Sequence, residues 1–421
     1  MLLKKVISFL LLVMSCVFLF VGFSLAEESI TVIMPRHEMD IKGVWERQTR
    51  EFEKESGIKV ELIQMAWERV ADKVVTEMAS GGSAFDVIEF DNVWPAKFLS
   101  AGWITPLDSF IDQATIDKIL PGLVSTFSKD GHLYGMVWNN DTRFFMYNSK
   151  KLKDAGIGAP PKTWTEFTEQ TKKLQTANLI KYGYIGAWEQ SQMLTNEHTF
   201  FSYSFGSTLF TEDGKPTFTE QPAIDALTFM VEAINTEKTI DPASITMNYE
   251  GAANVFYNGD TAFFLQAWPG VYAYSNDPAA SKIVGEVEVA EWIPAAREEL
   301  QATLTLPEAL AIPETSQHKE AAWKYIEYMT SPEREKERAL EIGALPTWKD
   351  LFTDPDLLVQ YPYWKYFGEQ ALYAKGHPKL VWFDEWAVNE QIEVQNALMG
   401  IKTPEQALKD LYETLRRNFE K

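Results

Sequence analysis

Cysteine is nearly absent from this chain. Cys16 is the only one among 421 residues, and it lies in an N-terminal segment with the features of a removable export signal. A mature chain without cysteine forms no disulfide bonds, so its stability must come from its hydrophobic cores. Histidine is scarce as well, with five residues and no pair at the i, i+4 spacing. Because that spacing places two imidazoles on one helix face, we expect no metal site and assign no cofactor.

Positive charge is also in short supply. The chain has 39 basic and 60 acidic residues, a formal net charge of −21, and loss of the two lysines of the N-terminal segment brings it to −23. Such a charge repels nucleic acid and anionic lipid surfaces and favours solubility, so we expect no nucleic-acid partner. No internal repeat or low-complexity tract is visible. About 395 residues remain after export, which indicates two domains, and we expect a monomer.

The N-terminus has the pattern of a secretory signal peptide. Two lysines precede an apolar run over residues 6–23, and small residues stand at both cleavage positions in 24–26. The pattern predicts a signal peptide, residues 1–26, cleaved after Ala26, and therefore a location in the periplasm or at the cell surface. A retained membrane anchor is the alternative, since eighteen apolar residues can just span a bilayer. Lipid attachment at Cys16 is disfavoured, because it would leave apolar residues on the mature protein.

Hydrophobic periodicity after the signal predicts alternating strands and helices. We expect strands at 30–34, 59–64 and 86–90, and helices at 41–56, 67–79 and 94–99. This order implies a parallel sheet with helices on its faces, a fold of the α/β class. Further along, we expect helices at 164–175, 223–235, 319–329 and 331–343, a last helix from Thr403, and strands at 182–187, 262–266, 287–291 and 309–312.

The most specific stretch runs from Gly131 to Phe167. It contains Gly-His-Leu-Tyr-Gly, then Tyr-Asn, then Ala-Gly, and finally Pro-Pro-Lys-Thr-Trp-Thr-Glu-Phe. Thr163 and Glu166 have the spacing of a capping box, in which the threonine hydroxyl accepts from the Glu166 amide and the carboxylate reaches back to the Thr163 amide. The whole stretch closely resembles the central signature of the family 1 extracellular solute-binding proteins of ABC importers, whose sugar-binding members show G-x-L-Y-G, Y-N, A-G and P-P-x-T-W-x-E-F.

This resemblance covers nearly the whole mature chain and implies its architecture. It implies the two-lobe periplasmic-binding-protein fold of type II, which is hinged and has its ligand cleft between the lobes. On this basis the N-terminal lobe comprises residues 27–138 plus 285–342, with the strand at 287–291 returning into it. The C-terminal lobe then comprises residues 139–284 plus 343–421. Such lobes close around a ligand by hinge motion.

Polar candidates for the cleft lie at strand ends and at the expected crossing between lobes. Asp91 follows a predicted strand, where α/β sheets bind ligands, and it matches an Asp that hydrogen-bonds sugar hydroxyls in maltose- and trehalose-type binders. Its alternative role is the N-cap of the next helix. Asn140, Asp141 and Arg143 lie at the crossing, and Asp141 also matches a sugar-contacting Asp. The alternative there is a polar turn with Arg143 paired to Asp141.

Tryptophans supply flat surfaces against which a sugar ring can pack. Trp268 precedes a proline after a predicted strand and resembles the W-P element of the family, whose Trp lies against a pyranose. Trp188 also follows a predicted strand. Trp382 and Trp386 stand where related proteins place late cleft aromatics, with core packing as the alternative. Trp67 follows the second strand and is a candidate for the first-lobe wall or for the start of its helix.

Two glutamates complete the candidate site. Glu38 follows the first strand and is a hydroxyl acceptor on the cleft side. Glu308 belongs to Leu306-Pro307-Glu308, which stands where many relatives carry Gly-Gly, often followed by Trp. Glycine allows close backbone approach to a ligand, so the sequence predicts an altered wall here, in which Glu308 replaces a ring with an acceptor.

The resemblance implies a substrate-binding protein of an ABC importer. It would capture a neutral mono- or oligosaccharide by lobe closure and deliver it to the permease subunits, with no catalytic step. A secreted glycoside hydrolase stays open, because carboxylates and aromatic rings also build such active sites. The same fold binding a polyol, a glycerophosphodiester or an anionic sugar stays open too, with Arg36 and Arg143 as the relevant cations.

Overall fold

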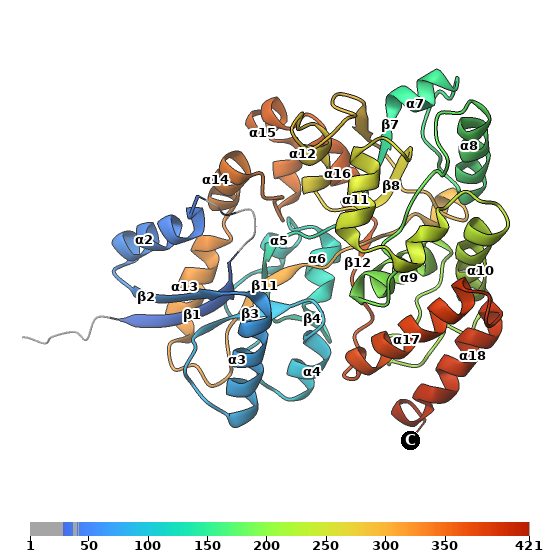
Figure 1. The fold of residues 1–421 in the computed structure, drawn as a ribbon. Helices are drawn as coiled ribbons and strands as arrows, with labels where there is room; N and C mark the ends of the chain where they lie inside the picture. Colours follow the sequence, from blue (N-terminus) through green and yellow to red (C-terminus); the bar gives the residue numbers. More distant parts are fainter. Residues whose placement is uncertain (1–27, 37–39, 41, 421) are drawn as a thin grey trace, which may run out of the picture.

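The computed structural model describes residues 28–36, 40 and 42–420, and only the backbone of residues 67 and 68. The predicted signal peptide and Glu38 therefore lie outside the described residues, as does the side chain of Trp67. Figure 1 shows two lobes side by side, with the blue N-terminal strands in one and the green and red helices in the other. No helix in the described part of the chain is long and apolar enough to cross a membrane.

The first lobe is built on a five-stranded sheet. Its strand order is β2 (Lys59–Met65), β1 (Ser29–Pro35), β3 (Val87–Asp91), β11 (Glu308–Ala311) and β6 (Met136–Asn139). Strand β1 runs parallel to β2 and β3, as predicted, whereas β11 is antiparallel to β3 and to β6. The other elements of this lobe are α2 (Val44–Ser56), α3 (Trp67–Ser80), α4 (Pro95–Ser100), α5 (Gln113–Ile116), α6 (Pro121–Thr126), β4 (Ser128–Lys129), β5 (His132–Leu133), α13 (Lys319–Met329) and α14 (Pro332–Ile342).

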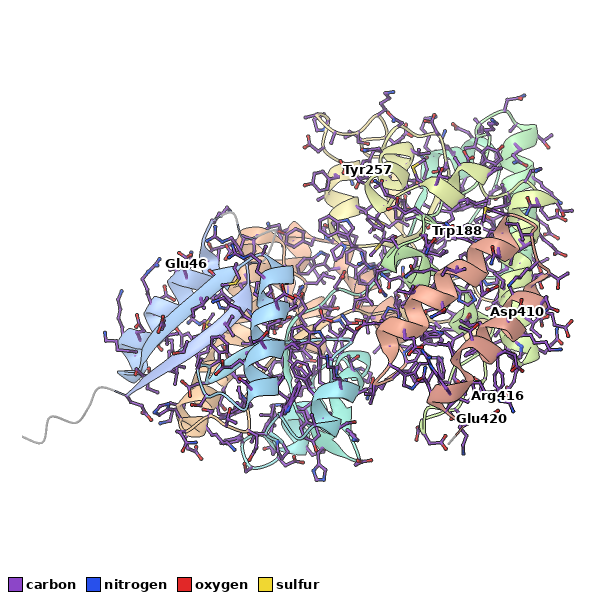
Figure 2. All side chains as sticks on the ribbon, turned by 60° about the horizontal axis from the view of Figure 1, so that its bottom comes forward. Glu46, Trp188, Tyr257, Asp410, Arg416 and Glu420 are labelled. Carbon is purple, nitrogen blue, oxygen red and sulfur yellow. The ribbon has the colours of Figure 1, made fainter. Side chains whose placement is uncertain are left out.

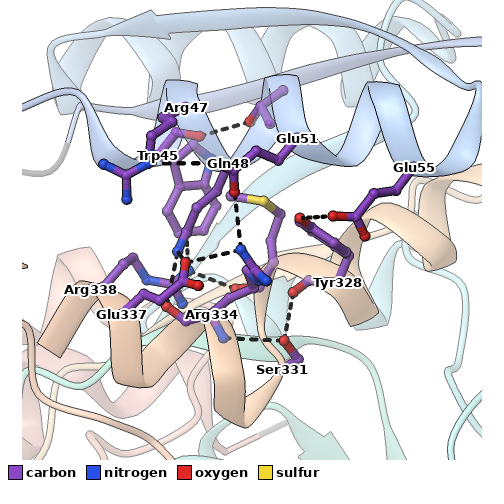
Figure 3. A network of polar contacts seen from close by, with 12 residues as sticks. Trp45, Arg47, Gln48, Glu51, Glu55, Tyr328, Ser331, Arg334, Glu337 and Arg338 are labelled. Carbon is purple, nitrogen blue, oxygen red and sulfur yellow. Dashed lines mark hydrogen bonds and ion pairs between the residues drawn. The ribbon is translucent and has the colours of Figure 1, made fainter. Parts of the chain in front are cut away.

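A buried polar network ties α2 to α14 (Figure 3). Arg338 is 4% exposed and donates to Gln48 Oε1 at 2.8 Å and to the Met329 carbonyl at 2.7 Å. Its guanidinium carbon lies 4.8 Å from the centroid of a Trp45 ring. Because Arg338 is fully desolvated, these contacts are what make its charge tolerable inside the lobe.

The second lobe has a smaller antiparallel sheet in the order β8 (Phe263–Ala267), β7 (Phe144–Asn148) and β9 (Val287–Val289). Helices surround this sheet: α7 (Ser149–Asp154), α8 (Trp164–Thr176), α9 (Gln192–Ser204), α10 (Gln221–Asn235), α11 (Tyr249–Tyr257), α12 (Gly270–Ser275), α17 (Phe383–Leu398) and α18 (Pro404–Leu415). Figure 2 shows Trp188, Tyr257 and Asp410 in this lobe and Glu46 in the other.

Three segments lie side by side where the lobes meet. The Arg143 amide donates to the Leu304 carbonyl at 2.9 Å, and Thr142 Oγ1 lies 2.9 Å from Thr305 Oγ1. The Thr305 amide donates in turn to the Lys375 carbonyl at 3.0 Å. Two short parallel strands form part of this junction, β10 (Thr303–Leu304) and β12 (Ala374–Lys375), and the remaining helices near it are α15 (Pro355–Gln360) and α16 (Trp364–Ala371).

Two lobe boundaries differ from the predicted ones. Strand β9 does not return to the first lobe, because it pairs with the free edge of β7, and the return occurs through β10 and β11. Residues 343–349 stay with the first lobe, where Trp348 Nε1 donates to the Thr330 carbonyl at 2.9 Å and Trp348 forms a bridge with Ile119. The sequence pattern predicted these elements but did not indicate which sheet edge or core each one covers.

Local predictions mostly agree with the structure. Residues 182–187 are an exception, since they form only one isolated bridge, from Tyr184 to Ile240. At the start of α8 the Glu166 amide donates to Thr163 Oγ1 at 3.2 Å, as predicted. The Glu166 carboxylate, however, accepts from the Lys162 amide at 2.7 Å and not from that of Thr163. The capping box is therefore shifted by one residue on its glutamate side.

Helix α9 is unusual because all its residues from Leu194 to Ser204 are buried, polar ones included. Glu197 is 3% exposed and accepts from the Tyr184 hydroxyl at 2.9 Å, the Ala187 amide at 2.9 Å and Trp188 Nε1 at 2.7 Å. Burial raises the pKa of this carboxyl to about 7, although the three donors oppose the shift. Glu197 thus fixes the helix whose first turn faces the space between the lobes.

We expect Arg338→Ala to lower the free energy of unfolding by about 3 kcal/mol, because it leaves buried acceptors and the nearby Glu335 charge without their cation. Urea unfolding measures this change. The control is Arg417→Ala, which removes an ion pair to Glu385 from a side chain that is 77% exposed, and it should change stability by less than about 0.5 kcal/mol. Equal effects of the two substitutions would contradict the assigned role of Arg338.

A pH dependence follows from Glu197. Its raised pKa means that the folded protein keeps a proton that the unfolded chain releases, so this contribution to stability is complete below pH ~4.5 and is lost as the pH rises to about 7. Relative to Glu197→Gln, which cannot titrate, the wild-type free energy of unfolding should fall by about 3 kcal/mol across this window. Urea unfolding at several pH values tests this, and a difference that does not vary with pH would contradict it.

Candidate functional site

A cavity of about 600 Å³ lies between the two lobes. The first lobe contributes Pro35, Arg36, Asp91, Asn92, Val93, Trp138, Asn139 and Glu308, and the second contributes Gln192, Met193, Asn196, Trp268, Pro269, Phe383 and Asp384. The crossing residues Asn140, Asp141, Arg143 and Leu306 line it as well, together with Ala344, Leu345 and His377. The volume and the mixture of rings with converging polar groups are typical of a small-molecule site.

Asp91 is placed in the cavity by the end of β3. It is 6% exposed, and its Oδ1 accepts from the Val93 amide at 3.1 Å and from Asn92 Nδ2 at 3.2 Å. These bonds hold the carboxylate at the carboxyl edge of the sheet, where it lines the cavity. Helix α4 has Trp94 as its N-cap and no side-chain capping bond. Asp91 is therefore not the N-cap of α4, which was the alternative role predicted from the sequence.

Glu308 lies beside Asp91 across the sheet. Strand β11 places it directly opposite Asp91 in the antiparallel register, and its Oε2 accepts from Asn139 Nδ2 at 3.0 Å. Behind the two, Glu89 is 0% exposed and accepts from Trp138 Nε1 at 3.1 Å. Burial, followed by the negative charges of Glu308 and Asp91, raises the pKa of Glu89 well above its usual range. The wall at Glu308 is thus strongly acidic.

The crossing residues have structural and cavity-facing roles at once. Asn140 is 2% exposed, and its amide group donates to the Pro346 carbonyl at 2.8 Å and accepts from Thr142 Oγ1 at 2.6 Å. Arg143 donates to Asp141 at 2.8 Å, which is the pairing that the sequence left as an alternative. Both members of this pair nevertheless line the cavity. Asn140 contributes mainly by fixing the junction, whereas Asp141 and Arg143 present charge to the cavity.

Trp268 lines the cavity from the second lobe. Its amide donates to the Tyr249 hydroxyl at 3.0 Å, and its ring lies next to Gly270, where an added Cβ would stand 2.1 Å from a ring carbon. A glycine is therefore required at position 270 for the ring to keep this place. Trp268 also borders a second cavity of about 530 Å³, which shares Asp141 and Arg143 with the first.

Three other predicted tryptophans, Trp188, Trp382 and Trp386, do not line the cavity. Trp188 is 0% exposed and bonded to Glu197, and Trp386 is also 0% exposed and packs against Phe383. Trp382 is partly buried against Phe210 and is not among the lining residues. The prediction that these three tryptophans line the cleft is therefore wrong, because their rings pack in the core of the second lobe. At the start of α17 the cavity is lined by Phe383 and Asp384 instead.

Sequence reasoning missed His377. It is 7% exposed, its Nε2 lies 2.8 Å from Asn196 Oδ1, and burial lowers its pKa to about 3. The ring is therefore neutral, with Nε2 as donor and Nδ1 as an acceptor that has no partner among the described residues. Gln192, Met193 and Asn196 were missed as well, because the first turn of α9 carries no motif that marks it as facing a cavity.

Comparisons with known proteins agree with this geometry. Residues 40–336 match the model of the family described as bacterial extracellular solute-binding protein. A probable ABC transporter-binding protein of Deinococcus radiodurans is 29% identical over 318 residues, which cover 74% of each chain. Of solved structures, maltose-bound MalE3 of T. maritima has a TM-score of 0.75 at 28% identity, covering 92% of this chain and 99% of that one.

A second solved structure points in the same direction. The ABC transporter solute-binding protein of Thermotoga lettingae bound with alpha-D-tagatose has a TM-score of 0.73 at 26% identity and covers 93% of this chain and 99% of that one. The two lobes are therefore those of the type II periplasmic-binding fold. Because the family model covers most of the residues, this chain belongs to the bacterial extracellular solute-binding proteins.

Proposed function

We propose that this protein binds a neutral carbohydrate between its lobes and delivers it to the permease of an ABC importer. The observation that carries the proposal is that the partly buried ring of Trp268 lines the same cavity as carboxylates of the first lobe and of the crossing between the lobes. Sugar C–H groups pack on an aromatic face, while each carboxylate accepts from two hydroxyls and thereby distinguishes their spacing. Maltose and tagatose, bound by the two solved relatives, belong to this class.

The charge of the cavity favours an uncharged solute over an anionic one. Asp91, Asp141, Glu308 and Asp384 line it against the two cations Arg36 and Arg143, of which Arg143 is bonded to Asp141. An anionic sugar or a glycerophosphodiester would face this excess of negative charge. A neutral polyol would not, and it remains the second candidate, because it offers the same hydroxyls without a ring face for Trp268.

The protein acts outside the cytoplasm, after cleavage of the signal peptide behind Ala26. It works as a monomer whose lobes close on the solute and present a joint surface to the permease. The reaction is binding and release, with no bond broken, so purified protein leaves a polysaccharide intact. Release of reducing sugar from a polysaccharide would instead support the hydrolase alternative.

A thermal-shift screen against mono- and oligosaccharides, with mannitol and ribitol as polyol controls, tests the ligand class. A ligand that binds only the folded state raises the free energy of unfolding, by about 2.7 kcal/mol at a ligand concentration of 100 Kd. The melting temperature rises with it. We expect at least one neutral saccharide to give a larger shift than any polyol or uronic acid. A shift confined to uronic acids or to glycerophosphodiesters would contradict the proposal.

Trp268→Ala should weaken the affinity for the sugar found in that screen by about 1–3 kcal/mol, because the ring no longer covers the apolar face of the sugar. Calorimetric titration measures the loss. The matched control is Trp292→Ala, which removes a ring that contacts Lys162 and Pro161 and lines neither cavity. Unchanged affinity in the Trp268 variant would remove this residue from the binding site.

A further inference from the structure

Three carboxyl groups converge at the first-lobe wall of the cavity. One oxygen from each of Glu89, Asp91 and Glu308 lies within 4.8 Å of the other two. Glu89 and Asp91 are two residues apart on β3, so their side chains leave the same face of the strand. The register of β11 brings Glu308 opposite Asp91. The cluster is thus built by the sheet itself and does not depend on a loop.

Glu89 provides an independent sign that something is missing from this cluster. It is 0% exposed, and its Oε1 has no hydrogen-bond partner among the residues that the structure describes, while Oε2 is bonded to Trp138. A buried carboxyl oxygen without a hydrogen-bond partner is costly, and the neighbouring charges of Asp91 and Glu308 repel each other. A cation among the three groups would satisfy the unpaired oxygen and offset the repulsion.

We propose that Glu89, Asp91 and Glu308 form a binding site for one divalent cation and that Ca²⁺ is the ion that fits it. Ca²⁺ is bound by oxygen atoms at about 2.3–2.6 Å, so two ligands on opposite sides of the ion stand about 4.6–5.2 Å apart. Three oxygens that all lie within 4.8 Å of one another are close enough for one such ion to contact each of them. Zn²⁺ prefers nitrogen and sulfur ligands, which the cluster lacks.

The ion has an entry path and room for its remaining ligands. Asp91 and Glu308 line the cavity, whereas Glu89 lies behind them. A Ca²⁺ ion held by three carboxylates keeps several coordination positions, which face the cavity and take water or hydroxyl oxygens. The sequence expectation of no metal was based on histidine spacing, which bears on imidazole sites and not on a site made of oxygen atoms. The ion site holds whether or not the solute is a carbohydrate.

Calorimetric titration of Ca²⁺ into chelator-treated full-length exported protein tests the proposal. At physiological ionic strength, weak attraction to the acidic surface is screened, and we expect one saturable site. Tb³⁺ serves as a luminescent probe of the same position. Its emission should be excited through Trp138, which is bonded to Glu89, and should be quenched when Ca²⁺ displaces it.

Substitutions assign the site to the cluster. Glu89→Gln removes one of the three carboxyl ligands with little change of shape and should weaken Ca²⁺ binding about tenfold or more. The control is Glu335→Gln, which neutralises another carboxyl of the first lobe that is 3% exposed and bonded to Thr347, and it should leave Ca²⁺ affinity unchanged. Glu308→Gln, at the edge of the cavity, should give the same loss as Glu89→Gln and replaces it if that variant does not fold.

The proposal is overturned if the wild-type protein takes up neither Ca²⁺ nor Tb³⁺ at a single saturable site. It is also overturned if both cluster variants keep wild-type affinity. No solute is present in these titrations, so their failure leaves the carbohydrate proposal standing. A negative sugar screen, in turn, leaves a positive Ca²⁺ result valid.

Discussion

The whole architecture depends on the backbone pairing at the junction of the lobes. Residues 142 and 143 bond to 304 and 305, and 305 bonds to 375, so three segments from distant parts of the sequence are joined there. Each lobe has its own sheet, and the junction is where a change in their relative orientation must be absorbed. Asp141 and Arg143 sit in this connection and also line the cavity. Contact with a solute and movement of the lobes therefore involve the same few residues.

Much of the fold could be predicted from the sequence because local signals and the hydrophobic pattern agree. Gly57 ends α2 in the left-handed conformation, and the Gln406 amide donates to Thr403 at the start of α18, both as expected from their positions. The assignment of β9 failed for a physical reason. A strand of three residues carries too little pattern to specify which sheet edge it pairs with, and that choice is made by the free edge of β7.

The candidate site was less predictable, since burial is a property of the tertiary structure. Trp188 and Trp268 both follow predicted strands, yet one is bonded to Glu197 in the core and the other faces the cavity. The residues next to Trp188 in the sequence do not indicate that its ring is bonded to the buried Glu197. His377 lies in a segment without periodicity, so only the folded chain shows that it meets Asn196 at the cavity. Polar residues at strand ends, such as Asp91, were easier to predict, because ligands bind beyond the carboxyl ends of the strands in such sheets.

The glycine at position 270 has a consequence for how the shape of the cavity can change by substitution. The Trp268 ring occupies the space that any larger residue at 270 would need. Replacing Gly270 with alanine would therefore displace the ring and reshape both adjoining cavities, although Gly270 itself lines neither of them. A residue that lines neither cavity thus sets their dimensions, and a single substitution there can change which solutes fit.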